Sequence, residues 1–477
     1  MTWLLIALPL LAALAAFLTR SPVLRARLLP AVGLLHLAGT LATLPAWGRL
    51  PEGAWLGLDY LGGWVLLVVS VLFNICALYA PAYLALRPER DHRIFATCYL
   101  AFLGLASFLA QARHPGLVWV AMESMTLTTA PLIYFNRNRR SLEATWKYLV
   151  LGSVGIALAL LGTFFVAYAA HLGGIDEPLL FTRLMHGAPM LSRPWLRAGF
   201  VLTLVGYGTK MGLAPLHAWK PDAYGETPGI VGAILAGGVT SCAFLALLRI
   251  FAVAAAAGEI RFARELLLGF GLLSMGWALV FMVRQTDFKR LLAYSSVEHM
   301  GILAFGLGIG GAGTRFALYH LGANALVKSV LFISAGNIHR CYASKKLPFV
   351  TGAIRRTPVS GWLFLLGFLA ITGLPPFAPF ISEFNIAAAA LTGGHAVAGG
   401  AFLVLLGGIF IGMSDTVLQV VFGVPSPSRV RTPYRDTFAT TAPIIGAMGL
   451  ALILGLWLPR PLWNAIQGAT AYLEGTP

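Results

Sequence analysis

The chain has 477 residues, 58% of them hydrophobic and only 11% charged, with a mean hydropathy of +0.79 and a formal net charge of +16. Soluble domains average about 25% charged residues, so this composition excludes an ordinary soluble domain and indicates an integral membrane protein. The basic residues lie in short loops between apolar runs. This pattern is typical of topology signals and anionic-lipid contact, and it argues against binding to nucleic acid.

Runs of about 18–25 apolar residues predict an all-α polytopic membrane protein with about fourteen transmembrane helices. The first run ends at Arg20 and no basic segment precedes it, which favours a retained helix over a cleaved signal peptide. The predicted spans are 3–19, 28–46, 61–84, 94–111, 116–135, 145–170, 196–218, 229–254, 264–283, 291–311, 315–339, 360–388, 397–421 and 439–458.

Lysine and arginine predict the orientation of these spans. Loops after odd-numbered spans hold about 22 basic residues and loops after even-numbered spans about 9, so the odd-numbered loops should face the cytoplasm. Both termini are then predicted to lie on the outer, periplasmic side of a bacterial or archaeal cytoplasmic membrane. The long outer connection from His171 to Pro194 is too polar to span and predicts a short interfacial helix.

Two predicted spans carry helix breakers beside a charge. The seventh span places Lys210 among glycines and before Pro215, and the twelfth places three prolines just before Glu383. Proline removes a backbone donor and clashes with the preceding turn, so both helices should be broken at mid-membrane. Two ordinary proline kinks are the alternative.

Broken helices in corresponding places of two halves are typical of transporters built from inverted repeats. Helices 4–8 and 9–13 are therefore predicted to form two inverted five-helix repeats. The predicted organisation is an N-terminal part of three helices (1–92), a first repeat (93–255), a second repeat (256–422), and a last helix with its tail (423–477).

Glu123 and Lys210 are charges inside apolar spans, where an ionisable group costs roughly 2.5–3.5 kcal/mol. We expect them to pair at mid-membrane, since neither charge is cheaply left alone. Burial favours the neutral form of a lysine and a nearby carboxylate favours the charged form, so a change of partner can load or unload a proton. The alternative for Glu123 is a protonated carboxyl bonded to Ser124 or Thr126.

A second polar set lies on the tenth to twelfth spans. His320, Asn324 and Lys328 recur every four residues, which stacks them on one helix face about 6 Å apart. His299 follows two serines and Glu298 on the preceding span. The alternative for His320, Asn324 and Lys328 is a polar helix face packed against a neighbouring helix. The candidate proton-pathway residues are Glu123, Lys210, His299, His320, Asn324, Lys328 and Glu383.

Cysteine and histidine spacing predicts neither a metal site nor a bound cofactor. The four cysteines are far apart with no CxxC pair, and the ten histidines include no HxxxH pair. No residue is predicted to be catalytic, and redox cofactors are expected to belong to partner proteins.

Four motifs resemble a known family. They are ESMTLTTAPLIYF at 123–135, KMGLAPLHAWKPDAYGETP at 210–228, AYSSVEHMGI at 293–302 and LPPFAPFISEF at 374–384. They are similar to the antiporter-like proton-pumping subunits of respiratory complex I and the membrane-bound [NiFe] hydrogenases, and to multisubunit sodium/proton antiporters. The first and third look most like the F-type subunit of hydrogenase-4. The resemblance covers helices 4 to 13.

The resemblance implies roles for single residues. Glu123 and Lys210 look like the family's Glu–Lys pair, Lys328 like its central lysine and Glu383 like its terminal residue. His217 and Asp222 match the loop after helix 7, in a supporting role. The chain departs from the family in helix 8, where a bridging Lys or His is replaced by the hydroxyls of Thr240 and Ser241. These hydroxyls either hold a water wire or belong to a small-residue packing face.

The resemblance also implies a function. It implies a proton-translocating subunit of a redox-driven complex, of translocase class and without a redox site of its own. The implied partners are other membrane subunits of a hydrogenase- or complex I-like assembly, its peripheral redox arm, and the lipid bilayer. The transported ion would be the proton, with sodium as the alternative. A cation/proton antiporter module without redox coupling, and a structural membrane anchor, are the competing functions.

Overall fold

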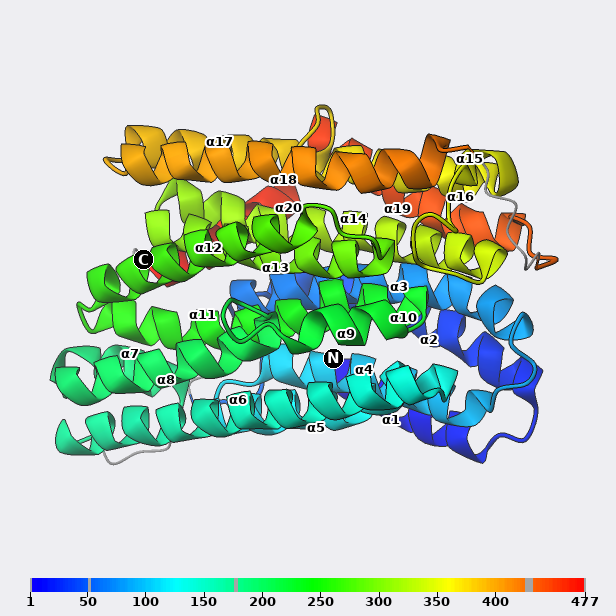
Figure 1. The fold of residues 1–477 in the computed structure, drawn as a ribbon. Coiled ribbons are helices and arrows are strands. Elements are labelled where there is room, and N and C mark those ends of the chain that lie inside the picture. The colour runs from blue at the N-terminus through cyan, green and yellow to red at the C-terminus, as the bar shows by residue number, and fades with distance from the viewer. Residues whose placement is uncertain (1, 50–52, 176–178, 425–431, 476–477) are drawn as a thin grey trace.

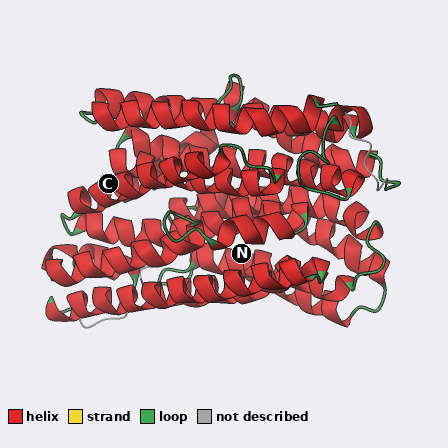
Figure 2. Cartoon of the chain, in the orientation of Figure 1, coloured by secondary structure: helices red, strands yellow, loops and turns green. Residues whose placement is uncertain are grey.

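The computed structural model describes residues 2–49, 53–175, 179–424 and 432–475. In these residues the chain is helical throughout, with two isolated β-bridges and no strand. The helices run roughly side by side and are joined by short loops at the two ends of the bundle (Figure 1, Figure 2). This arrangement satisfies the backbone within each helix, as a hydrocarbon environment requires.

The helices match the predicted spans closely in position. In chain order they are α1 (Thr2–Leu18), α2 (Pro22–Thr43), α3 (Tyr60–Ala85), α4 (His92–Gln111), α5 (Pro115–Ile133), α6 (Arg139–Leu172), α7 (Phe181–His186), α8 (Arg193–Met211), α9 (Trp219–Glu226), α10 (Gly229–Ile234), α11 (Thr240–Ala256), α12 (Ile260–Met282), α13 (Phe288–Ile309), α14 (Ala312–Tyr342), α15 (Ala353–Arg356), α16 (Pro358–Ile371), α17 (Ala378–Thr392), α18 (Ala396–Phe422), α19 (Phe438–Leu456) and α20 (Arg460–Glu474).

Eleven helical segments of the described chain are long and apolar enough to cross a membrane. They include the continuous segment Gly229–Ala256, which joins α10 to α11 through a π-helical stretch at Leu235–Val239. Each of the fourteen predicted spans contains a helix, but α1, α8, α16 and α17 do not qualify by length and composition. The multi-pass membrane character is confirmed, whereas the count of fourteen and the inverted repeats remain predictions.

Both predicted interruptions are present. Helix α8 ends at Met211, and the chain resumes as α9 only at Trp219. Helix α16 ends at Ile371 and α17 begins at Ala378. The first residue past α8 is Gly212, at φ +80°, a left-handed conformation that glycine adopts without the Cβ penalty. The interruptions expose backbone groups in the interior of the bundle.

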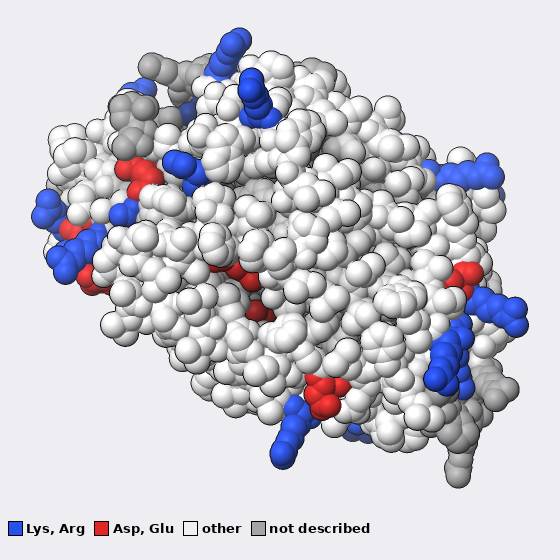
Figure 3. Space-filling view, turned by 90° about the horizontal axis from the view of Figure 1, so that it is seen from above, with Lys and Arg blue, Asp and Glu red and all other residues white. Residues whose placement is uncertain are grey.

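The surface charge fits a membrane-spanning bundle. Lysine and arginine side chains gather towards two opposite ends, and the broad surface between them is mostly uncharged, with a few acidic atoms visible in a recess near its middle (Figure 3). Helix α7 lies near one end and α15 near the other (Figure 1). The short helix α7 falls in the connection where an interfacial helix was predicted.

The sequence patterns did not predict α20. This helix has an apolar face on which Ile466, Ala469 and Leu473 are buried. Its last residue, Glu474, accepts hydrogen bonds from Thr314 Oγ1 (2.7 Å) and the backbone N–H of Gly311 (3.0 Å), and pairs with Arg264. Fifteen half-polar residues are too few and too polar to resemble a span, so hydropathy alone missed this helix.

A buried ion pair joins α11 to the start of α3. The Arg249 guanidinium is 1% exposed and donates to Asp59 Oδ2 (2.7 Å) and to the Ala110 carbonyl (3.0 Å). Asp59 also caps α3, since its Oδ1 accepts from the backbone N–H of Gly62 (2.6 Å). The pair therefore ties three segments together.

Replacing Asp59 by Asn should lower the free energy of unfolding by about 3 kcal/mol, because it leaves the Arg249 charge buried without a carboxylate. Asparagine keeps an oxygen for the helix cap. Chemical unfolding in mixed micelles measures the change. The control is Glu265→Gln, which breaks the exposed pair Arg261–Glu265 and should cost at most a few tenths of a kcal/mol. Equal losses in the two variants would contradict a special role for the buried pair.

Candidate functional site

The structure buries most of the predicted pathway residues inside the bundle. Lys210, His299, His320 and Lys328 are all 0% exposed, and Asn324 and Glu383 are also buried. Glu123 is only partly buried. Side chains of this kind remain in a membrane interior mainly where they carry ions or protons or contact each other.

Lys210 lies at the end of α8 among side chains of α5 and α6. Its ammonium donates to Thr126 Oγ1 (2.6 Å) and lies over the ring of Tyr148, 5.0 Å from the centroid. The Tyr148 hydroxyl is in turn hydrogen-bonded to Thr129 (2.7 Å). The lysine is therefore held by a hydroxyl and an aromatic face. We call Glu123, Thr126, Tyr148 and Lys210 the first cluster.

Glu123 and Lys210 form no direct ion pair in the described chain, and each contacts α6 instead. Its Oε1 accepts from Ser153 Oγ (3.2 Å) on α6. The residue before this serine is Gly152, where a Cβ would overlap the Lys210 ammonium. The two charges thus contact consecutive residues of α6, and a close Glu–Lys pair stays a prediction.

A second cluster lies where α13, α14 and α17 meet. Lys328 donates to Ser295 Oγ (2.6 Å). His299 Nδ1 and His320 Nε2 are 3.0 Å apart, and the other ring nitrogen of His320 lies 2.7 Å from Ser382 Oγ. Three helices that are distant in sequence therefore contribute to one hydrogen-bonded row.

Carboxylates flank this row on both sides. Glu383 Oε1 is 4.0 Å from His299 Nδ1, and Glu298 Oε2 is 3.8 Å from His299 Nε2. The second cluster therefore comprises Glu298, His299, His320, Lys328 and Glu383, with Ser295 and Ser382. Glu298 is 2% exposed and belongs to the cluster as fully as His299. Its burial was hard to predict because it lies towards one end of the predicted span.

Several polar atoms of the two clusters, and of Asn324 on α14, are buried without a hydrogen-bond partner among the described residues. They are Oε2 of Glu123, Oε2 of Glu298, Nε2 of His299, both amide atoms of Asn324 and Oε1 of Glu383. An unsatisfied buried polar group costs about 1–3 kcal/mol, so such groups usually bind ordered water. These atoms mark positions where ordered water would complete the hydrogen bonding of the buried side chains.

His299, His320 and Glu383 also offer a possible ligand set for a cation. One ligand atom from each lies within 4.8 Å of the others, and all three residues are buried. Two imidazoles and one carboxylate are donors that zinc and other transition metals accept. The same geometry suits proton transfer, since the two facing ring nitrogens are already at hydrogen-bond distance.

The hydroxyls of Thr240 and Ser241, which begin α11 in the eighth predicted span, are hydrogen-bonded within their own helix. Thr240 Oγ1 donates to the Ala236 carbonyl and Ser241 Oγ to the Gly237 carbonyl, each at 2.6 Å. A Cβ on Gly237 would lie 3.1 Å from the Ala325 backbone of α14. These contacts favour the packing reading over the water-wire reading of this segment.

The sequence patterns missed a third buried lysine. Lys220 on α9 is 0% exposed, and its ammonium donates to Ser296 Oγ (3.2 Å) and to the Ser296 carbonyl (3.3 Å). It lies past the end of the seventh predicted span, in the polar stretch WKPDAYGE, so hydropathy does not predict its burial. The signal that could have found it is the apolar sequence Leu213–Trp219 immediately before it.

The two supporting residues have different surroundings. Asp222 accepts from Lys147 (2.7 Å) and pairs with Arg290, so it ties α9 to α6 and α13. Burial tends to raise the pKa of the Asp222 carboxyl, but these two cations outweigh it and hold the pKa below its ordinary value. His217 is buried, with its ring 5.7 Å from that of Trp277. Neither contacts Lys210 or Lys328 by a hydrogen bond in the described structure.

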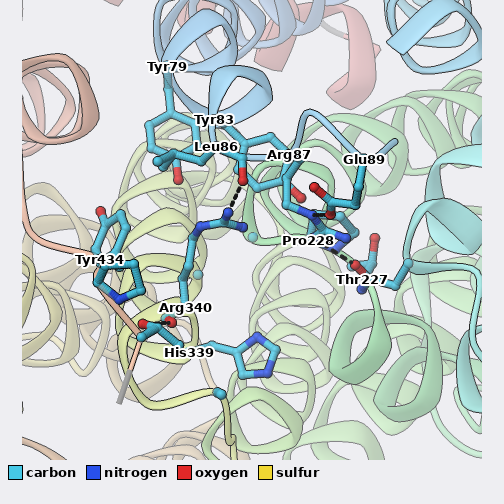
Figure 4. Close-up of a pocket in the computed structure, with 16 residues that line it drawn as sticks. Tyr79, Tyr83, Leu86, Arg87, Glu89, Thr227, Pro228, His339, Arg340 and Tyr434 are labelled. Carbon is cyan, nitrogen blue, oxygen red and sulfur yellow. Dashed lines mark hydrogen bonds and ion pairs between the residues drawn. The ribbon is translucent and has the colours of Figure 1, made fainter. Parts of the chain in front are cut away.

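A cavity of about 490 Å³ opens at one end of the bundle, between the ends of α3 and α14 and the start of α10 (Figure 4). Its lining includes Arg87, His339 and Arg340. Arg340 donates to the Leu86 carbonyl, and Arg87 pairs with Glu89 (2.6 Å). His339 lies on α14 eleven residues after Lys328, about 16 Å along the helix axis. The cavity thus borders the end of α14, the helix that also carries His320 and Lys328.

With this geometry in view, comparison with known proteins decides the family. The profile of the NADH:quinone oxidoreductase/Mrp antiporter transmembrane family matches residues 112–410. The chain belongs to this family. The matched region runs from the end of α4 into α18 and includes every residue of the two clusters.

Individual relatives agree with the family profile. The chain is 34% identical to a hydrogenase-4 component F homolog of Methylacidiphilum infernorum, over 89% of this chain and 90% of that protein. It is 31% identical to NADH-quinone oxidoreductase subunit N of Desulforudis audaxviator, over 82% and 80% of the two chains. A chain of an Mrp complex from a Dietzia species has the same fold, with a TM-score of 0.88 at 21% identity and coverage of 99% and 97%.

Replacing Gly152 by Ala tests the position of the Lys210 ammonium. A helical Gly→Ala change ordinarily stabilises by about 0.5–1 kcal/mol. Here the added methyl group overlaps the Lys210 ammonium, the far end of a flexible side chain, so the lysine should shift and cancel most of this gain. The matched control is Gly269→Ala on α12, where a Cβ meets nothing within 4 Å. Chemical unfolding in micelles compares the two. An equal gain in stability at both positions would show that Lys210 does not rest against Gly152.

Proposed function

We propose that this chain is the proton-translocating membrane subunit of a redox-driven complex, and that protons cross it through the two clusters. The observation that carries the proposal is the burial of Lys210 and Lys328 inside the bundle, each bonded to a hydroxyl rather than to a carboxylate. The relatives named for hydrogenase-4 and for NADH-quinone oxidoreductase support coupling to a redox partner.

The contacts of the lysines fit a proton-carrying role. A buried ammonium with a permanent carboxylate partner is held in its charged form, whereas one bonded to neutral hydroxyls can lose its proton at little electrostatic cost. When they are ionised, Glu123 near Lys210, and Glu298 and Glu383 within the second cluster, are close enough to favour the charged forms of the two lysines. A shift of these carboxylates can then load and release the lysines.

The surface of α5 and α6 supports a partner subunit in the membrane. Glu123 is only partly buried, and Ser153, which donates to it, is exposed on the flank of the bundle. A carboxyl facing lipid is costly, so a neighbouring membrane subunit should cover this face. We assign the peripheral redox arm to other chains, because redox cofactors were expected there from the sequence.

The orientation of the chain follows from the basic loops. We place the end that contains α15 in the cytoplasm of a prokaryotic cell and both termini on the periplasmic side. The cavity lined by Arg87, His339 and Arg340 then opens to the cytoplasm and is the proposed mouth for proton uptake. The regions 93–255 and 256–422 are proposed as the two inverted repeats, each with one interrupted helix.

A cation/proton antiporter module is the second candidate. It is favoured by the fold shared with a chain of an Mrp complex and by the ligand set of His299, His320 and Glu383. In this function the energy would come from an existing gradient, and the cluster would exchange a cation for protons.

Replacing Lys210 or Lys328 by Ala should reduce proton flux at least tenfold in vesicles that carry the whole complex, because each variant removes a buried proton carrier. Assembly, measured by co-purification, should be retained. The control is Lys346→Ala, which removes an exposed lysine from the loop between α14 and α15 and should leave the flux unchanged. Normal flux in both the Lys210 and the Lys328 variants would refute the proposed pathway.

Removing sodium distinguishes the two candidate functions. A redox-driven proton pump should keep its full flux in sodium-free vesicles supplied with the electron donor, because no cation is exchanged. An antiporter module should lose its flux without a cation gradient and should work without an electron donor. Proton uptake followed with a pH-sensitive dye measures both conditions. Flux that needs sodium and ignores the donor would replace the first proposal by the second.

A further inference from the structure

Neither the family resemblance nor the proposed pathway uses Lys220, although this lysine is completely buried. It lies on α9, the short helix that follows the interruption of α8. Within the described residues it forms no ion pair with a carboxylate, and its ammonium lies 5.7 Å from the centroid of the Tyr224 ring. A buried lysine without a counter-charge has little to fix it in the charged form.

On one side Lys220 reaches the second cluster. Its ammonium donates to Ser296 Oγ (3.2 Å), and the adjacent residue of α13, Ser295, accepts from Lys328 (2.6 Å). Two consecutive hydroxyls on one helix therefore lie between two buried amines. No other contact in the described structure brings two buried lysines to neighbouring residues of one helix.

On the other side the stem of Lys220 rests against the end of α8. A Cβ on Gly212 would overlap this stem and come within 2.9 Å of the ammonium. Gly212 is two residues past Lys210. The ring of Trp219, next to Lys220, packs at 5.1 Å from that of Tyr148, the ring that Lys210 faces. Lys220 thus bridges the surroundings of the first cluster and the hydroxyls of the second.

Other segments offer no better link. The hydroxyls of Thr240 and Ser241 already donate to their own helix backbone, and the glycines beside them pack against α3, α4 and α14. The titratable groups around Lys220 are Tyr224 on its own helix, His217 on the preceding loop, His299 on α13 and Lys328 on α14.

We propose that Lys220 carries protons between the first and the second cluster. It takes the role that the sequence suggested for the hydroxyls of Thr240 and Ser241. The neutral amine of Lys220 accepts a proton that leaves the Lys210 ammonium through an intervening hydroxyl or water. It then releases the proton through Ser296 and Ser295 to the neutral amine of Lys328. Only N–H and O–H bonds form and break, and one positive charge moves. The inference rests on the proposed function.

The test measures proton flux in vesicles that carry the complete complex. Lys220→Met, which keeps the volume and removes the amine, should reduce flux at least tenfold while co-purification is unchanged. Lys220→Arg should also fail, because a guanidinium keeps its charge and cannot release a proton. Lys220→His should restore part of the flux with its pH dependence moved to lower pH, since imidazole ordinarily titrates near pH 6.5 and an amine near 10.4. Rescue by Arg and failure of His would show a structural charge and overturn the inference.

A control for buried cations is Arg25→Met. Arg25 on α2 is also buried, and its guanidinium donates to the Ala16 and Thr19 carbonyls, in neither cluster. This variant should keep its flux. A loss equal to that of Lys220→Met would mean that removing any buried cation harms the protein, and it would overturn the inference.

Comparison among the variants separates this inference from the proposed function. If Lys210→Ala and Lys328→Ala lose flux while Lys220→Met keeps it, the pathway stands without Lys220 and the inference fails alone. If the double variant Thr240→Val/Ser241→Ala then loses flux, the hydroxyls of Thr240 and Ser241 form the link instead. If neither Lys210→Ala nor Lys328→Ala alters flux, the proposed function itself fails.

Discussion

The free-energy cost of an ionisable group in hydrocarbon governs the architecture of this protein. Each lysine, histidine and carboxylate that enters the membrane must find polar partners inside the bundle, since lipid offers none. The packing of α13, α14 and α17 provides such partners for Lys328 and His320 through Ser295 and Ser382. Helices α5 and α6 do the same for Lys210 through Thr126 and the ring of Tyr148. The polar interior and the apolar exterior are thus two results of one constraint.

The two helix interruptions extend this logic to the backbone. Each contains a glycine at positive φ, Gly212 at +80° and Gly373 at +73°. At each, an ionisable side chain occupies the space that a Cβ would fill, Lys220 at the first and Glu383 at the second. The interruption therefore serves two purposes. It frees backbone groups at the membrane interior, and it lets a charged side chain approach the main chain closely.

How much of this could be predicted from the sequence depends on the contrast between a residue and its surroundings. Lys210, Lys328 and Glu383 stand in long apolar runs beside glycine or proline, so their burial and the broken helices were predictable. The burial of Lys220 was not predictable because the residues after it are polar, and only the three-dimensional fold places α9 in the interior. Helix α20 escaped because its apolar face is short. The contacts of Glu123 depend on side-chain rotamers and on Gly152, and no periodic pattern encodes these.

The hydrogen bonds of the histidine pair define an ordered row of donors and acceptors. Ser382 Oγ donates to the Pro379 carbonyl (2.8 Å), so it accepts from His320 Nδ1, and the neutral His320 ring then accepts at Nε2 from His299 Nδ1. A proton that enters at His299 Nε2 and leaves at His320 Nδ1 reverses the tautomer of both rings. The pair cannot pass a second proton in the same direction until both rings have reset. In the proposed pathway the two histidines would therefore pass protons one at a time, and the tautomers of their rings would record the last transfer.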